Sequence, residues 1–178
     1  MGMPLKPQDL LVCLALAARG PAPWTYAELG TDLGLSASEA NKAVERAVAA
    51  GLLAPALEPR GKPIPVRATL LEFLAHGVRH AFFARPGRMV RGMPTAHSAP
   101  PLKNRLRGGD EPPLVWPDAK GEQRGQAVDP LYPSVPDAAR RHPGLYELLA
   151  LTDAVRCGRA RERKLAVAEL EKRLTDGR

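Results

Sequence analysis

The 178-residue sequence is poor in the residues on which several protein classes depend. Phe, Trp and Tyr make up only 4%, so the chain lacks the aromatic platform on which proteins stack the bases of single-stranded nucleic acids. Its two cysteines, Cys13 and Cys157, form neither a disulfide framework nor a metal knuckle, and we expect both to be small buried side chains. The apolar residues 10–18 are too few to span a bilayer and the start has no leader pattern, so we expect a cytoplasmic protein without membrane contact.

Sequence motifs that mark common enzymes are also missing. No Gly-rich phosphate loop follows a strand pattern, and no Gly-x-Ser-x-Gly elbow occurs. His76 and His80 have the spacing of two metal ligands on a helix, but Gly77 stands where a zinc metalloprotease has its Glu. We therefore expect no enzymatic activity, no metal and no cofactor.

Positive charge is unevenly distributed along the chain. The net charge is +7, yet residues 1–84 hold 8 Lys and Arg against 7 Asp and Glu, whereas residues 85–178 hold 18 against 12. Residues 85–109 contain no acidic residue and are rich in Gly and Pro, which disfavours regular structure. This pattern is typical of a basic arm that contacts phosphates or an acidic partner, and equally of a solvated loop. The cationic residues of this segment are Arg85, Arg88, Arg91, Lys103, Arg105 and Arg107.

The most informative segment is residues 25–53, because it contains two capping boxes in succession. Thr25 with Glu28, and Ser36 with Glu39, each pair a hydroxyl residue with an acidic residue three positions later, the arrangement that begins a helix. Gly34, between the two boxes, tolerates the left-handed backbone that ends a helix. The sequence therefore predicts two helices separated by one short turn, a helix-turn-helix.

The second of these helices has one apolar and one polar face. Ala40, Val44, Ala47 and Val48 recur at helical spacing and are expected to face the core. Polar residues on the opposite face are of types that bond base edges and phosphates in a major groove, although a solvated helix face has the same composition. The candidate DNA-contacting residues of the motif are Thr25, Ser36, Ser38, Asn41, Lys42, Glu45 and Arg46.

The sequence on either side of this motif adds a helix and a small hairpin. An amphipathic helix is expected from Pro7 to Gly20. After the motif, residues 52–57 and 64–66 predict two strands, and residues 58–63 have turn chemistry. Three prolines make this hairpin short and edge-like. The cations at its tip, Arg60 and Lys62, are further candidates for contact with phosphates or a minor groove.

In this order of elements, residues 6–66 resemble bacterial winged helix-turn-helix transcriptional regulators, broadly those of the MarR-like group. The resemblance covers about the first third of the chain, and most of the sequence after residue 67 does not match a MarR-like dimerisation region. It implies recognition of double-stranded DNA, usually by a homodimer that controls a nearby promoter. The reading segment it implies is residues 36–46.

The remaining sequence predicts a helix at 67–76 and a Phe-rich strand at 78–84, which would complete a first domain, 1–84. Residues 85–136 are expected to hold the basic arm, one hairpin between 114–116 and 123–128, and an extended strap. Apolar stripes in residues 137–178 predict a C-terminal helical hairpin that mediates dimerisation or holds a partner. Those stripes are formed by Leu145, Leu148, Leu149, Thr152 and Val155 and by Val167, Leu170 and Leu174.

The sequence therefore predicts a mainly α protein with small β elements: an N-terminal winged helix-turn-helix, an irregular Pro-rich middle and a C-terminal helical hairpin. The expected function is sequence-specific binding of double-stranded DNA by a homodimeric regulator, in most cases of this kind a repressor. The alternative is an antitoxin or protein-interaction module that uses the winged helix as a scaffold and the basic half to hold an acidic partner such as a toxin. The nearly neutral first half favours this alternative, because duplex-binding surfaces concentrate positive charge.

Overall fold

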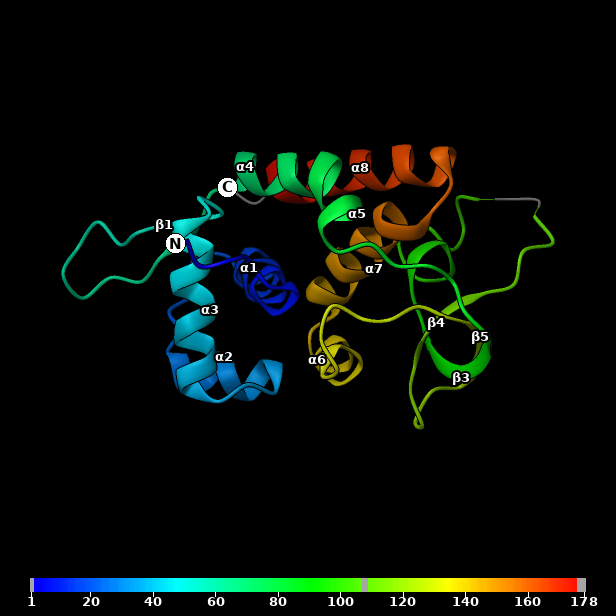
Figure 1. The fold of residues 1–178 in the computed structure, drawn as a ribbon, viewed down its shortest axis with the longest axis horizontal. Coiled ribbons are helices and arrows are strands. Elements are labelled where there is room, and N and C mark those ends of the chain that lie inside the picture. The colour runs from blue at the N-terminus through cyan, green and yellow to red at the C-terminus, as the bar shows by residue number, and fades with distance from the viewer. Residues whose placement is uncertain (1, 107–108, 176–178) are drawn as a thin grey trace.

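The computed structural model describes residues 2–106 and 109–175 of the chain. The fold is mixed α and β, and helices dominate, as expected from the sequence (Figure 1). The helices are α1 (Pro7–Arg19), α2 (Tyr26–Leu33), α3 (Ala37–Ala49), α4 (Arg67–Glu72), α5 (Val78–Ala81), α6 (Val135–Arg141), α7 (Pro143–Cys157) and α8 (Ala160–Thr175). A π-helical turn at Phe73–Gly77 joins α4 to α5, and a short 3-10 helix covers Ala96–Ser98. The strands are β1 (Leu53–Ala54), β2 (Ile64–Pro65), β3 (Met89–Pro94), β4 (Leu114–Pro117) and β5 (Gln123–Ala127).

Helices α2 and α3 are joined by a short turn whose geometry follows from the local sequence. Both predicted capping boxes are present: the Thr25 hydroxyl accepts from the Glu28 amide, and the Ser36 hydroxyl accepts from the Glu39 amide, each at 3.1 Å. Each hydrogen bond satisfies a backbone N–H that has no partner within its own helix. Gly34 adopts φ +66°, the left-handed conformation that ends α2. The two helices are therefore positioned largely by interactions within residues 25–39.

Gly30 allows the turn to lie directly against α2. A Cβ atom at this position would be only 2.5 Å from the Leu35 carbonyl oxygen. The Leu35 amide donates to the Gly30 carbonyl at 2.8 Å, and the Leu35 side chain is buried. This close approach holds the turn against α2. Because α1 packs against both α2 and α3, the three helices form one N-terminal unit.

Helix α7 is the centre of the fold. It packs against α1, α5, α6 and α8, and against the 3-10 helix at Ala96–Ser98 (Figure 1). Along the top of Figure 1, α4 and α8 run side by side above α7. Ten residues of α7 are buried, from Leu145 to Arg156, so this helix is covered on nearly every side. One hydrophobic core thus runs through both ends of the chain.

The C-terminal hairpin predicted from the sequence is present as α7 and α8. Its apolar stripes face the protein's own core, because Leu148, Leu149 and Val155 of α7 and Leu170 and Leu174 of α8 are all buried. Burying these side chains is the main favourable contribution to the folding of this region. The stripes are therefore not exposed for the dimerisation or partner binding expected of them.

Strands β3, β4 and β5 form a small closed barrel at the end of the molecule away from α3 (Figure 1). β3 pairs antiparallel with both β4 and β5, so β4 and β5 run parallel to each other instead of forming the predicted hairpin. Gly92 and Gly121 allow the strands to close, since a Cβ at Gly121 would lie 2.2 Å from the Gly92 carbonyl. β3 also occupies part of the segment predicted to be an irregular basic arm. That prediction was wrong for residues 89–94.

A buried polar cluster attaches the barrel to α7. The Asp153 carboxylate accepts from the Thr95 hydroxyl at 2.7 Å, from the Trp116 indole N–H at 2.6 Å and from the Arg156 guanidinium at 2.6 Å. Arg156 also donates to the Phe82 carbonyl at 2.7 Å. Because every member is hydrogen-bonded, the cluster ties three segments together without leaving a buried charge unpaired.

Residues 78–84 do not form the predicted strand. Leu70, Leu74 and Val78 recur every four residues and are fully buried, so the helical stripe of α4 continues through the π-helical turn into α5. Gly77 accommodates the Phe73 ring, which would lie 2.7 Å from a Cβ at that position. The strands of the N-terminal hairpin are also shorter than predicted, with two residues each, since proline flanks or occupies both.

Candidate nucleic-acid interface

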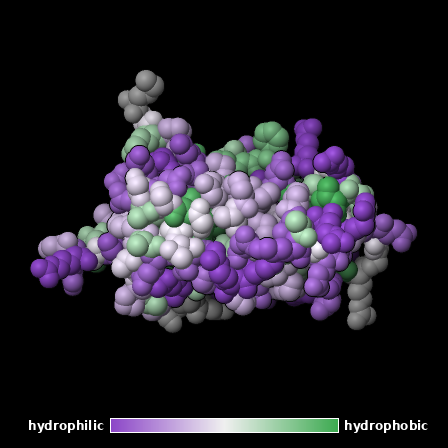
Figure 2. All heavy atoms as spheres, turned by 90° about the horizontal axis from the view of Figure 1, so that it is seen from below, coloured by the Kyte–Doolittle hydropathy of each residue, from purple (hydrophilic) through white to green (hydrophobic). Residues whose placement is uncertain are grey.

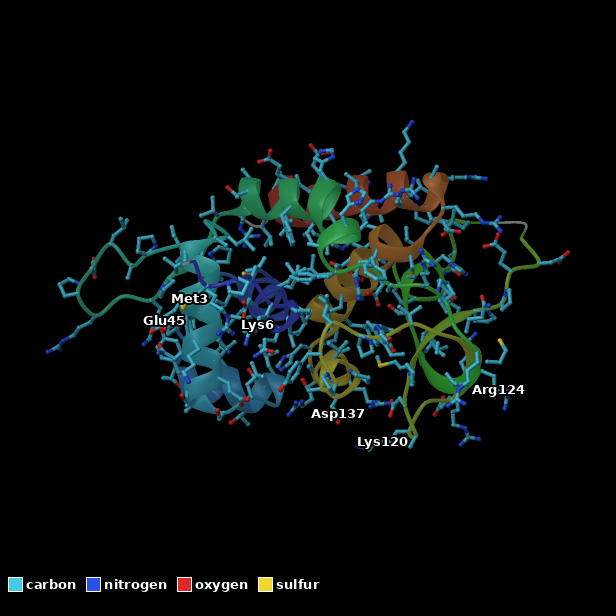
Figure 3. The ribbon with its side chains drawn as sticks, in the orientation of Figure 1. Met3, Lys6, Glu45, Lys120, Arg124 and Asp137 are labelled. Carbon is cyan, nitrogen blue, oxygen red and sulfur yellow. The ribbon has the colours of Figure 1, made fainter. Side chains whose placement is uncertain are left out.

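The polar face of α3 is turned outward, as its spacing predicts. Ser38, Lys42 and Glu45 are exposed and Asn41 is half-buried. Figure 3 shows Glu45 on the side of α3 that faces away from α6 and α7. The Asn41 side-chain amide donates to the Glu45 carboxylate at 3.1 Å, so the two side chains are held together one helical turn apart. Asn41 is the residue best suited to read adenine. In the protein without DNA, one of its two amide N–H donors is therefore already hydrogen-bonded to Glu45.

Arg46 does not belong to this face. Its guanidinium is buried and makes two hydrogen bonds to the Asp9 carboxylate of α1, at 2.8 Å and 2.7 Å. These hydrogen bonds raise the pKa of Arg46, which stays charged. The Asp9 carboxylate also accepts from the Lys6 amide at 2.7 Å, completing the start of α1. Arg46 thus fastens α3 to α1, and its prediction as a DNA-contacting residue is corrected.

The hairpin of β1 and β2 projects from the body beside α3 (Figure 1). Arg60, in the loop between the strands, is exposed and makes no ion pair with any residue whose position the structure gives. Lys62 instead folds back over the ring of Tyr26, 4.3 Å from its centroid, and lies 5.7 Å from that of Trp24. This cation–π contact holds the base of the loop against the start of α2. Leu57, within the same loop, is 97% exposed.

Tyr26 is a residue of this surface that the sequence pattern did not single out. It is the first residue of α2 and packs edge-to-face on Trp24, with ring centroids 5.2 Å apart. Burial and, to a smaller degree, the negative charge of Glu45 raise the pKa of Tyr26, so its hydroxyl remains protonated. The only sign of this role in the sequence is the pair of aromatic residues, Trp24 and Tyr26, on either side of the cap residue Thr25. These two rings lie next to Lys62 only in the folded protein.

Charges of both signs occur on and around this surface. Lys42, Arg60 and Lys62 are accompanied by Glu45 and Glu39, and hydrogen bonds from Ser36 lower the pKa of Glu39, which keeps it ionised. Figure 2, which views the molecule from below, shows a largely hydrophilic face with the projecting hairpin at its left edge. The charges named on this surface nearly cancel, as do those of residues 1–84 as a whole.

The basic-arm candidates lie apart from α3. Arg88 directly precedes β3, and Arg91 of β3 is paired in register with Arg124 of β5, which Figure 3 places at the opposite end of the molecule from Glu45. Lys103 is exposed, whereas Arg105 is engaged with the buried Glu169 of α8. Arg107 lies outside the described residues. The predicted site therefore divides into an α3 surface and a separate set of exposed arginines in β3, in β5 and in the segment before β3. We call this set the arginine surface and define it as Arg85, Arg88, Arg91 and Arg124.

Three further features concern metal ligands, the two cysteine thiols and membrane-spanning helices. Within residues 2–106 and 109–175, no three His, Cys, Asp or Glu side chains lie close enough together to hold a metal ion. Burial raises the pKa of both Cys13 and Cys157 to about 12, so neither thiol is ionised at neutral pH. In the same part of the chain, no helix has the length and apolar character needed to cross a bilayer.

Comparison with known proteins found no matching family model, no similar curated protein and no similar solved structure.

Proposed function

We propose that the protein is a transcriptional regulator that binds double-stranded DNA sequence-specifically, with a winged helix-turn-helix formed by α1–α3 and the β1–β2 hairpin. The observation that carries this proposal is the outward polar face of α3, presented on a rigid pair of capped helices beside a projecting hairpin. A helix of this kind fits a major groove, and a hairpin beside it reaches the adjacent backbone or minor groove.

The residue types on these two elements suit those contacts. Asn41 is able to bond an adenine edge, and Lys42 a guanine edge or a phosphate. Arg60 and the exposed Leu57 at the hairpin combine a cation with an apolar side chain, the two kinds of group that proteins insert into minor grooves. A homodimer would place two α3 helices about one duplex turn apart, roughly 34 Å, on a palindromic operator.

The first test is titration of the full chain against duplex DNA from the region upstream of its own gene and against a scrambled duplex. The titration is repeated at two salt concentrations. We expect tighter binding to the upstream duplex, weakened for both duplexes by salt because phosphate contacts release counterions. Equal affinity for the two duplexes, or no binding at low salt, would exclude sequence-specific recognition.

Three substitutions assign the contacts. Asn41→Ala should weaken binding to the preferred duplex by about 5- to 150-fold, the range for one lost base contact, with little effect on the scrambled duplex. Arg60→Ala should weaken binding to both duplexes alike and reduce the salt slope. Lys120→Ala is the matched control, because Lys120 is exposed and far from α3 (Figure 3). If Lys120→Ala weakens binding as much as Arg60→Ala, the hairpin has no special role.

The second candidate function is an antitoxin or protein-interaction module. It is favoured by the arginine surface, whose four residues make no ion pair among the described side chains. They lie in β3 and β5 or in the segment before β3, and Figure 3 places Arg124 at the opposite end of the molecule from Glu45. Such a surface suits an acidic protein partner. Co-purification from the native host should then recover one protein with the full chain, and replacing the four arginines with alanine should abolish its recovery. If Asn41→Ala abolishes the recovery of the partner instead, the partner binds the α3 surface.

A further inference from the structure

A pocket of about 260 Å³ lies where α1, α2 and the beginning of α7 meet. It is smaller than the roughly 300–1,000 Å³ of sites for drug-sized ligands, so any occupant must be small. Its apolar lining, which we call the floor, consists of Ala15, Ala18, Leu29, Leu33 and Leu145.

Ionisable groups converge on one side of this pocket. The Arg19 guanidinium is 3.4 Å from one Asp32 carboxylate oxygen, and the His142 Nε2 is 3.5 Å from the other. Arg141 donates to the backbone carbonyl of Asp32 at 2.8 Å, which places a second guanidinium at the rim. Two guanidiniums against one carboxylate leave an excess of positive charge.

Two nitrogen atoms of this group are buried without a hydrogen bond. Neither the Arg19 Nε nor the His142 Nε2 has a hydrogen-bond partner within the described part of the chain. Both atoms are enclosed by the protein: the His142 Nε2 faces the Asp32 carboxylate, and the Arg19 guanidinium is held by Asp32 and by the Pro23 carbonyl, to which it donates at 2.9 Å. Both belong to side chains that line the same pocket.

We propose that this pocket binds a small organic carboxylate, with the carboxylate beside Arg19 and His142 and the apolar part on the floor. The cationic side, where the Arg19 and Arg141 guanidiniums meet the single Asp32 carboxylate, calls for an anion. Inorganic phosphate would leave the apolar floor uncovered, and a neutral apolar molecule would leave the excess positive charge without an anion. A carboxylate with a short apolar body satisfies both halves.

A ligand in this pocket would contact parts of the fold that are far apart in the sequence. α1 and α2 contribute one wall, and residues 141–145 contribute the other. The α2 side of this junction is already attached to α6 where the Ser134 hydroxyl donates to the Leu33 carbonyl. A ligand held between these walls therefore stabilises the folded state, and the melting temperature rises with the logarithm of the ligand concentration once that exceeds the dissociation constant.

The test is calorimetric titration of the full chain with benzoate, whose nine non-hydrogen atoms suit the size of the pocket. A dissociation constant on the order of 1 mM is expected for a ligand this small. Benzyl alcohol and inorganic phosphate are the comparison probes, and both should bind at least about tenfold more weakly. No binding of benzoate at about 10 mM, or binding of phosphate as tight as that of benzoate, would overturn the proposal.

Three variants test whether benzoate binds in this pocket. Arg19→Gln should weaken benzoate binding at least about tenfold, by removing the cation. Ala18→Leu should abolish it by filling the pocket, and it leaves Arg19, Asp32, Arg141 and His142 in place. Arg85→Gln removes an arginine outside the pocket and should bind benzoate as the parent does. Unchanged binding by folded Ala18→Leu protein would show that benzoate binds elsewhere, and the proposal would then be wrong.

Discussion

Replacing Arg46 with methionine should destabilise the protein severely while leaving base recognition intact. Arg46 is 9% exposed, and its guanidinium makes two hydrogen bonds to Asp9, which is fully buried. Methionine preserves much of the volume of the arginine stem, so the substitution leaves the Asp9 carboxylate buried without its cation. The expected loss is therefore electrostatic and does not come from a cavity.

Removing one partner of a buried ion pair costs about 3–5 kcal/mol of unfolding free energy. For a chain of this length, that loss lowers the melting temperature by about 6–20 °C. The double variant Asp9→Leu, Arg46→Met removes both charges and should be more stable than Arg46→Met alone. It should remain about 1 kcal/mol below the parent, because Asp9 also accepts from the Lys6 amide at the start of α1.

Urea unfolding of the parent, both single variants and the double variant measures this coupling directly. DNA titration at a temperature where Arg46→Met is fully folded gives the second readout, and its sequence preference should equal that of the parent. A loss of less than about 1 kcal/mol in Arg46→Met, together with a lost sequence preference, would return Arg46 to the reading face and refute the structural assignment.

Three further predictions concern other positions. Gly30→Ala should cost about 1–3 kcal/mol in urea unfolding, because the new Cβ meets the Leu35 carbonyl oxygen, whereas Gly144→Ala, whose nearest neighbour is 3.9 Å away, should be neutral. Glu45→Gln should tighten binding to every duplex several-fold by removing a negative charge beside the phosphates, and unchanged affinity would place Glu45 outside the interface. Burial raises the pKa of Glu169, but hydrogen bonds from Lys172, Arg173 and Arg105 outweigh it and hold the value at about 2. Because this folded-state pKa is depressed, the stability advantage over Glu169→Gln should be complete above about pH 5 and shrink as the pH falls toward 2, which acid titration of both proteins would show.

Local signals explain why the α2–α3 unit was predictable. The hydroxyl and acidic residues of each capping box lie three positions apart, and Gly34 marks the end of α2 by its own backbone preference. None of these features depends on a distant contact. The sequence therefore contains both helix starts and the turn between them.

The predictions that were wrong concern residues whose partner in the folded protein lies far away in the sequence. Arg46 was assigned to the polar face, yet its partner Asp9 is 37 residues away, and the only local sign of burial was its position next to the buried Ala43 and Ala47. The parallel pairing of β4 with β5 similarly requires β3, which the Gly and Pro content of residues 85–109 concealed. Arg105 was assigned to a free arm because Glu169, its partner, lies 64 positions later.

Selection of a randomised duplex library with the full-length protein tests the central proposal most directly, since the selected pool itself reveals the operator. We predict enrichment of a defined sequence, palindromic if the protein is a homodimer, and loss of preference at one adenine position when the selection is repeated with Asn41→Ala. A pool that remains random after successive rounds with the parent protein would contradict the proposal and leave α3 as a scaffold for protein contacts.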